Sequence, residues 1–217
     1  MKELSAQGAS KAFTLIEVLV VLAVVMMLGA LVTPVIDRPG RAVTARCLGN
    51  LRQIEIGYVM FLSDHHEKFP WQLSSDQGGT YEVSANGPAA QFQVLATYTS
   101  KPEVFHCPGD TARHPAASYD VLNNTNISYF VNIDAVITNA PSITILLGDR
   151  NLRANGRPVN TGLFNLATNL NVSWAAPVHP QGGSLGFADG HAESVPNAKL
   201  KAIVQRQPTA TSRLLIP

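Results

Sequence analysis

Histidine and carboxylate side chains in the last quarter of the sequence have the types and spacing that could bind a metal ion. His179 stands ten positions before Asp189, which is followed directly by Gly190 and His191. Two imidazoles and a carboxylate form a ligand set that suits Zn²⁺ or Fe²⁺. The His-Glu-x-x-His helix motif of zinc enzymes is absent, so ligand type alone does not identify a metal.

The same residues also fit a purely structural hairpin. Asp189-Gly190 lies between two β-prone runs, and Asp-Gly favours a type I′ turn because both of its central residues need positive φ. One face of this predicted hairpin carries Leu185, Phe187 and Ala192, and the other carries Ala188, His191 and Glu193.

Nucleophilic catalysis has little support in the sequence. Ser184, His191 and Asp189 could be combined into a hydrolase triad, but the Gly-x-Ser-x-Gly elbow that would position the serine is missing. There is also no glycine loop of the kind that cradles phosphate. We therefore expect no enzymatic activity and name no catalytic residue.

Two cysteines, Cys47 and Cys107, leave two possibilities open. In an exported protein such a pair can form one disulfide. The alternative is two buried free thiols, which behave as small apolar side chains.

Composition points to a loop-rich domain outside the cytoplasm. Of the 217 residues, 14% are charged, against roughly 25% in average globular proteins. The net charge of +1 offers no basic face for nucleic acid. The length suits one domain plus a terminal segment.

The strongest pattern is an apolar run of 25 residues between Lys11 and Asp37, in which Glu17 is the single charged residue. About 20 apolar residues of helix span the roughly 30 Å hydrocarbon core of a bilayer. Lys2 and Lys11 precede the run, which places its N-terminal end on the cytoplasmic side.

Three other interpretations compete with a membrane-spanning assembly helix. A cleaved signal peptide would use residues 18–32 as its apolar region, with the small residues Gly29 and Ala30 near its cleavage site. The second is a plain membrane anchor. Neither a signal peptide nor a plain anchor needs Glu17, because a carboxylate in an apolar segment is costly. The third is a buried core helix, which the length of the run disfavours.

Residues 12–17, AFTLIE, resemble the start of the type IV prepilin family, which includes the type II secretion pseudopilins. The resemblance implies that a prepilin peptidase removes a leader, residues 1–12, by cutting between Ala12 and Phe13. Phe13 would then be N-methylated. The family usually has Gly before the cut, and Ala12 keeps a small residue there.

The resemblance also implies how subunits assemble. Glu17 would pair with the amine of Phe13 on a neighbouring subunit, and such a pair can fix the register between subunits. Pro34 matches a helix-kinking proline of the family. Pili, secretion pseudopili and DNA-uptake fibres share this N-terminal chemistry, so the motif does not distinguish among them.

A second resemblance lies further along the chain. His179 and Asp189-Gly190 match a His-x9-Asp-Gly signature at the C-terminus of a group of pilin-like proteins, and residues 47–69 and 104–110 are similar to the same group. The resemblance to pseudopilins implies calcium, because some of their heads hold it in a loop near the C-terminus. Ca²⁺ prefers six to eight oxygens, and Asp149 and Asp189 could contribute to them. No other cofactor is expected.

The first element that would position these residues is a long helix. Apolar residues spaced three and four apart predict an amphipathic helix that ends near Asp64. That stripe consists of Val43, Cys47, Leu51, Ile54, Tyr58 and Phe61, while Arg41, Arg46, Arg52 and Glu55 lie largely off it.

The remaining elements form a strand-rich head. Strands are predicted at residues 128–133, 142–147, 184–188 and 192–195, short helices at 89–98 and 197–205, a turn at Asn155-Gly156, and a loose segment at 206–217. A long N-terminal helix, partly transmembrane, packed on a small antiparallel β-sheet gives an α+β, pilin-like fold. The predicted organisation is a leader at 1–12, a transmembrane and assembly helix at 13–36, the periplasmic half of the helix at 37–68 and a globular α+β head at 69–217.

Together these patterns predict a structural pilin-like subunit of a type II secretion or type IV pilus-like filament. It would be a single-pass inner-membrane protein with its head in the periplasm, and it would reach the cell surface within a filament. Its expected partners are other pilin-like subunits, the prepilin peptidase and the inner-membrane assembly platform. The alternatives are an anchored binding module that does not polymerise and a metal-dependent enzyme on a membrane stalk.

Overall fold

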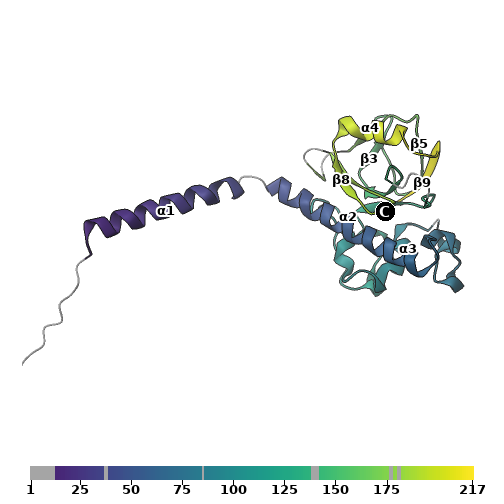
Figure 1. Cartoon of the computed structure of the whole chain (residues 1–217). Helices are drawn as coiled ribbons and strands as arrows, with labels where there is room; N and C mark the ends of the chain where they lie inside the picture. Colours follow the sequence, from purple (N-terminus) through teal and green to yellow (C-terminus); the bar gives the residue numbers. More distant parts are fainter. Residues whose placement is uncertain (1–12, 37–38, 85, 138–141, 176–177, 180–181) are drawn as a thin grey trace, which may run out of the picture. The chain divides into compact units, whose positions relative to one another are not determined.

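The computed structural model describes residues 13–36, 39–84, 86–137, 142–175, 178–179 and 182–217, and only the backbone of residues 30–36 and 39. The chain divides into two compact units, Met1–Pro39 and Gly40–Pro217. The first contains the helix α1, Leu15–Ile36, and the second is the head (Figure 1).

The helix α2, Pro39–Asp64, forms because its apolar residues recur every three or four positions and so build one apolar face. The predicted stripe is confirmed, with five of its members buried in the head: Cys47, Leu51, Ile54, Tyr58 and Phe61. Val43 is partly buried against them. The predicted end at Asp64 is also confirmed, and two residues with left-handed backbone follow it, His66 and Glu67, with φ of 54° and 59°.

The described part of the head contains two antiparallel sheets. The larger has the strand order β5-β9-β1-β2-β7-β8, and the smaller has the order β4-β3-β6. The larger sheet comprises β1 Tyr129–Asn132, β2 Ile145–Asp149, β5 Gly162–Ala167, β7 Gly183–Phe187, β8 Ala192–Val195 and β9 Thr211–Ile216. The smaller comprises β3 Leu152–Ala154, β4 Arg157–Pro158 and β6 Val172–Trp174. The prediction of an α+β fold with an antiparallel head is therefore confirmed.

Both faces of the larger sheet are covered, which explains why its central strands lack the alternation of a half-exposed strand. In β1, Tyr129 and Val131 belong to the core on the side of α2, whereas Phe130 belongs to the core on the opposite side. That opposite side is covered by α4, Asn197–Gln205, through Leu200 and Val204. The sheet thus lies between α2 and α4 (Figure 1).

Between α2 and β1 the described chain is built from short helical turns. They are α3 Pro88–Gln93 and the 3-10 helices η1 Pro70–Gln72, η2 Ser75–Gln77, η3 Tyr81–Val83, η4 Val94–Thr97, η5 Pro102–Phe105, η6 Tyr119–Val121 and η7 Asn124–Asn126. Phe69, Phe92 and Phe105 from this segment join the core around α2. The helix predicted at 89–98 corresponds to α3 and η4.

The prediction that residues 206–217 are loose was wrong. They contain β9, which pairs with β5 on one side and β1 on the other. Leu214, Leu215 and Ile216 are buried in succession, because this end of the strand faces a core on both sides. The turn at Asn155-Gly156 is confirmed, since these residues have φ of 51° and 80° and join β3 directly to β4.

Candidate functional site

The start of α1 is stabilised by reciprocal contacts between Thr14 and Glu17. Glu17 Oε2 accepts hydrogen bonds from the Thr14 backbone N–H and from the Thr14 hydroxyl, each at 2.8 Å. The Glu17 N–H lies 3.4 Å from Thr14 Oγ1. This arrangement is a capping box, in which the residue before a helix and the third helical residue satisfy each other's free backbone donors.

The capping box corrects the expectation that a plain membrane anchor has no use for Glu17. The carboxylate has a task within a single chain, because it satisfies a backbone donor that would otherwise lack a partner at the start of α1. The sequence signature, Thr followed three residues later by Glu, was present but not recognised. Evidence for an assembly role of Glu17 therefore has to separate its charge from its capping.

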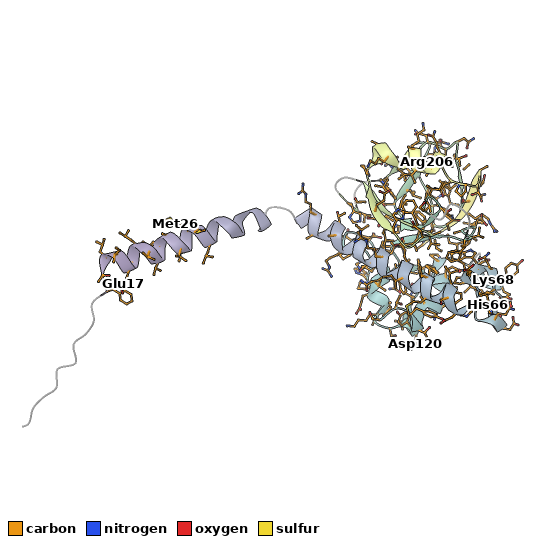
Figure 2. All side chains as sticks on the ribbon, in the orientation of Figure 1. Glu17, Met26, His66, Lys68, Asp120 and Arg206 are labelled. Carbon is orange, nitrogen blue, oxygen red and sulfur yellow. A yellow bond between two sulfur atoms is a disulfide. The ribbon has the colours of Figure 1, made fainter. Side chains whose placement is uncertain are left out.

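The helix α1 exposes apolar side chains on all sides. Among its large apolar residues from 15 to 28, the exposed fraction runs from 48% at Val18 to 78% at Leu15. Consecutive residues of a helix point in different directions, so residues 15–28 of α1 present apolar side chains all round, and Figure 2 shows side chains on both sides of this helix. Among the described residues, no helix is both long and apolar enough to cross a membrane.

The structure describes the other residues predicted to act at the N-terminus in different detail. Ala12 and the rest of the leader lie outside the described residues. Phe13 stands two residues before α1 with 82% of its surface exposed. Pro34 lies in the last turn of α1, where only the backbone is described.

In the head, Cys47 and Cys107 form a disulfide with an S–S distance of 2.11 Å. It joins α2 to the segment that follows η5, across a sequence separation of 60 residues. Both residues are completely buried. The structure therefore contains the crosslink, and not the pair of free thiols that the sequence left open.

His179 lies against this disulfide. Its Nε2 atom is 3.5 Å from Cys107 Sγ and 3.2 Å from Asp149 Oδ2, and its Nδ1 atom is 3.3 Å from Thr44 Oγ1. His179 is 5% exposed and Asp149 is fully buried. Asp149, the last residue of β2, also accepts a hydrogen bond of 2.6 Å from the backbone N–H of Ser184.

The metal set suggested by the sequence does not come together. In the described part of the chain, the His, Cys, Asp and Glu side chains that could jointly hold a metal are His179 and the two cysteines, whose ligand atoms lie within 4.8 Å of one another. Asp189 and His191 are outside this group. Asp149 and Asp189, the two carboxylates considered for calcium, belong to separate clusters, since Asp149 contacts His179 and Asp189 contacts His191.

The turn at Asp189-Gly190 is longer by one residue than predicted. The Phe187 N–H donates to the His191 carbonyl and the Gly190 N–H donates to the Phe187 carbonyl, each at 3.0 Å. The result is a three-residue loop with Gly190 at φ 87°. The added residue places His191 over Phe187, where the rings stack at 4.3 Å, and turns Ala192 toward the core around α2. The predicted faces of His191 and Ala192 were therefore wrong.

A buried carboxyl group beneath this hairpin was not predicted. Glu55 was placed off the apolar stripe, yet it is fully buried, and neither of its carboxyl oxygens has a hydrogen-bond partner among the described residues. A Cβ added at Gly186 in β7 would collide with Glu55 Oε1. Burial, reinforced by the negative charge of Asp189, raises the pKa of Glu55 to about 8. A glycine inside a strand, which marks a close approach, was the available signal.

Comparison with known proteins bears on the N-terminal segment. A family model described as a prokaryotic N-terminal methylation motif matches residues 8–33. No curated protein and no solved structure matches the chain. The match includes Phe13 and Glu17 and does not extend to the signature that begins at His179. The start of the chain therefore supports a type IV pilin-like or pseudopilin-like protein.

Proposed function

We propose that this chain is a structural pilin-like subunit of a type II secretion or type IV pilus-like filament. It is made as a prepilin, and prepilin peptidase cuts it between Ala12 and Phe13. The observation that carries the proposal is the methylation motif at residues 8–33, in which Phe13 and Glu17 stand at the head of an apolar run. The role is not enzymatic: the helix drives assembly and the head forms the outer surface.

Before assembly, residues 13–36 hold the chain in the inner membrane. The all-round apolar surface of α1 favours lipid, because each Å² of apolar surface removed from water contributes roughly 25 cal/mol. Lys2 and Lys11 keep the leader on the cytoplasmic side, where the peptidase acts. The head then lies in the periplasm, a compartment in which the disulfide of Cys47 persists.

During assembly, Glu17 exchanges its contacts with Thr14 for the amine of Phe13 on a neighbouring subunit. Peptidase cleavage creates this amine, so the pair forms only after processing. Two buried opposite charges stabilise a contact only when they meet at close range, and one left alone is strongly unfavourable. The pair therefore selects one register between adjacent subunits. The partners are other pilin-like subunits and the inner-membrane assembly platform.

Processing is tested by the mass of the N-terminal peptide of protein purified from its native membrane. We expect a peptide that begins at N-methylated Phe13. Protein made in a strain without the peptidase is the control and should keep Met1. An intact Met1 in the presence of the peptidase, or a terminus beyond Ala30, contradicts the proposal.

Assembly is tested by Glu17→Gln, which removes the charge but keeps a side chain that can close the capping box. The variant should be processed normally and stay in the membrane. Its incorporation into filaments, measured by immunoblot of sheared material, should fall roughly tenfold or more because the amine of Phe13 loses its counter-charge.

The matched control is Thr14→Ala, which weakens the cap at a cost of about 1 kcal/mol and keeps the carboxylate. This variant should assemble nearly as well as the wild type. Normal assembly of Glu17→Gln would show that Glu17 only caps its own helix. Absence of the wild-type chain itself from the sheared filaments would instead favour an anchored binding module that does not polymerise.

A further inference from the structure

The metal-binding atoms of Cys47, Cys107 and His179 meet in the buried part of the head, and Asp149 lies against His179. We term these four residues the cysteine–histidine cluster. They come from α2, the segment after η5, the end of β2 and the residues before β7. The two sulfurs and His179 Nε2 lie within 4.8 Å of one another, and Asp149 Oδ2 is 3.2 Å from that nitrogen. All four residues are buried.

Two distances from His179 match edges of a tetrahedral zinc site. With Zn–S bonds of about 2.3 Å and Zn–N and Zn–O bonds of about 2.0 Å, neighbouring nitrogen and sulfur ligands stand about 3.5 Å apart, and nitrogen and oxygen ligands about 3.3 Å apart. The observed distances from His179 Nε2 are 3.5 Å to Cys107 Sγ and 3.2 Å to Asp149 Oδ2. The two sulfurs would need to separate to about 3.8 Å. The carboxylate of Asp149, which is outside the group of ligand atoms within 4.8 Å of one another, would need to move toward them.

The surroundings of His179 provide the support that a zinc-binding imidazole needs. Such an imidazole binds the metal through one nitrogen and donates its other N–H to an acceptor. Thr44 Oγ1 lies 3.3 Å from Nδ1 and donates its own proton to the Gly40 carbonyl at 2.9 Å. The Thr44 oxygen can therefore accept a hydrogen bond from Nδ1–H when Nε2 binds a metal.

Asp149 supplies an independent indication of a missing ligand. Its carboxylate is completely buried, and its Oδ1 atom has no hydrogen-bond partner among the described residues. A buried carboxylate oxygen without a partner is costly. A bound cation would remove that cost.

We propose that the thiol form of this chain binds Zn²⁺ at the cysteine–histidine cluster. The ligands are the thiolates of Cys47 and Cys107 and Nε2 of His179, and Asp149 completes the set when its carboxylate moves toward the sulfurs. Two thiolates favour Zn²⁺ over the hard cations Ca²⁺ and Mg²⁺. The disulfide and the zinc site are alternative states of one cysteine pair, and the site lies apart from the N-terminal segment that drives assembly.

Both states follow from the two thiols that the chain carries when it is made. On metal binding, each thiol releases its proton and one Zn²⁺ takes their place. On oxidation, an external disulfide of a thiol oxidoreductase accepts two electrons and two protons and becomes a dithiol, while the S–S bond of Cys47 and Cys107 forms. Zinc therefore protects the pair from oxidation until it is removed.

The test uses the full chain in detergent, reduced with a phosphine, freed of reductant under argon and titrated with Co²⁺ as a spectroscopic probe. We expect one Co²⁺ per chain, with the strong visible absorption of a tetrahedral site and a near-ultraviolet band from thiolate-to-cobalt charge transfer. One equivalent of Zn²⁺ should abolish both. The oxidised chain should show neither.

Variants assign the ligands. Cys107→Ser should lose most of the charge-transfer intensity, and His179→Gln should weaken Co²⁺ binding roughly a hundredfold. Thr44→Val keeps every ligand and should weaken Co²⁺ binding about 10- to 100-fold, because the contact between Thr44 Oγ1 and His179 Nδ1 is lost. His191→Gln, outside the cluster, is the matched control and should bind normally.

Circular dichroism in the far ultraviolet separates binding from folding. A reduced, folded chain that takes up no Co²⁺ at micromolar concentration would overturn the proposal, and so would binding that is insensitive to Cys107→Ser. If the reduced chain is unfolded, Zn²⁺ should restore its fold. Failure of Zn²⁺ to restore the fold would also overturn the proposal. None of these results depends on filament assembly.

Discussion

Replacement of both cysteines by alanine is expected to lower the free energy of unfolding of the head by about 4 kcal/mol. The disulfide closes a loop across 60 sequence positions, so it removes many conformations from the unfolded chain. It also joins α2 to the segment after η5 inside the core. Because domains of this size are stable by about 5–15 kcal/mol, the crosslink accounts for a large share of the stability.

The measurement is denaturant unfolding of the detergent-solubilised chain, followed by tryptophan fluorescence in the presence of a chelator. Trp71 and Trp174 are both buried in the head, so the signal reports the head alone. Wild-type protein treated with a reductant is the control and should lose a similar amount. A difference below about 1 kcal/mol would show that the native pair is not crosslinked.

Glu55→Gln is expected to stabilise the head relative to wild type at pH 8, but not at about pH 5. In the unfolded chain the carboxyl ionises near its usual pKa of 4.5, whereas in the folded head it stays protonated up to about pH 8. Between these values the unfolded state releases a proton that the folded state keeps, so stability falls as pH rises and levels off above about pH 8. The loss is on the order of 4 kcal/mol.

This prediction is measured by comparing the unfolding free energies of wild type and Glu55→Gln across that range. Glu103→Gln, which removes an exposed carboxyl group, should leave the pH dependence unchanged. Gly186→Ala should destabilise the head even at about pH 5, because its Cβ collides with Glu55 Oε1. Parallel curves for Glu55→Gln and wild type would mean that Glu55 is solvated in the folded protein.

The elements set by local pattern were predictable from the sequence. The apolar stripe of α2 and the tight turn at Asn155-Gly156 depend on residues within one or two turns of chain, and both are observed. The chemistry at Phe13 to Glu17 is likewise a short motif. The capping role of Glu17 is just as local, because it depends only on Thr14, three residues earlier.

The features that escaped prediction depend on distant parts of the chain. His179 was considered together with Asp189 because the two stand ten positions apart, but the fold brings it to Thr44 on α2, which is 135 residues away, and to Asp149. Glu55 is buried because the β7–β8 hairpin covers a second side of α2, where Gly186 leaves room for its carboxyl group. The spacing of apolar residues around Glu55 in the sequence does not indicate this contact.

The position of β9 has a consequence for biogenesis. The strand lies between β5 and β1, and within the described residues β5 has no other neighbour in the larger sheet. A chain synthesised from its N-terminus therefore presents β5 long before its pairing partner exists. Contacts between such distant segments form late, because loop-closure entropy is lost before the pairing gains stability. The edge of the larger sheet formed by β5 and β9 therefore stays incomplete until residues 211–216 have emerged.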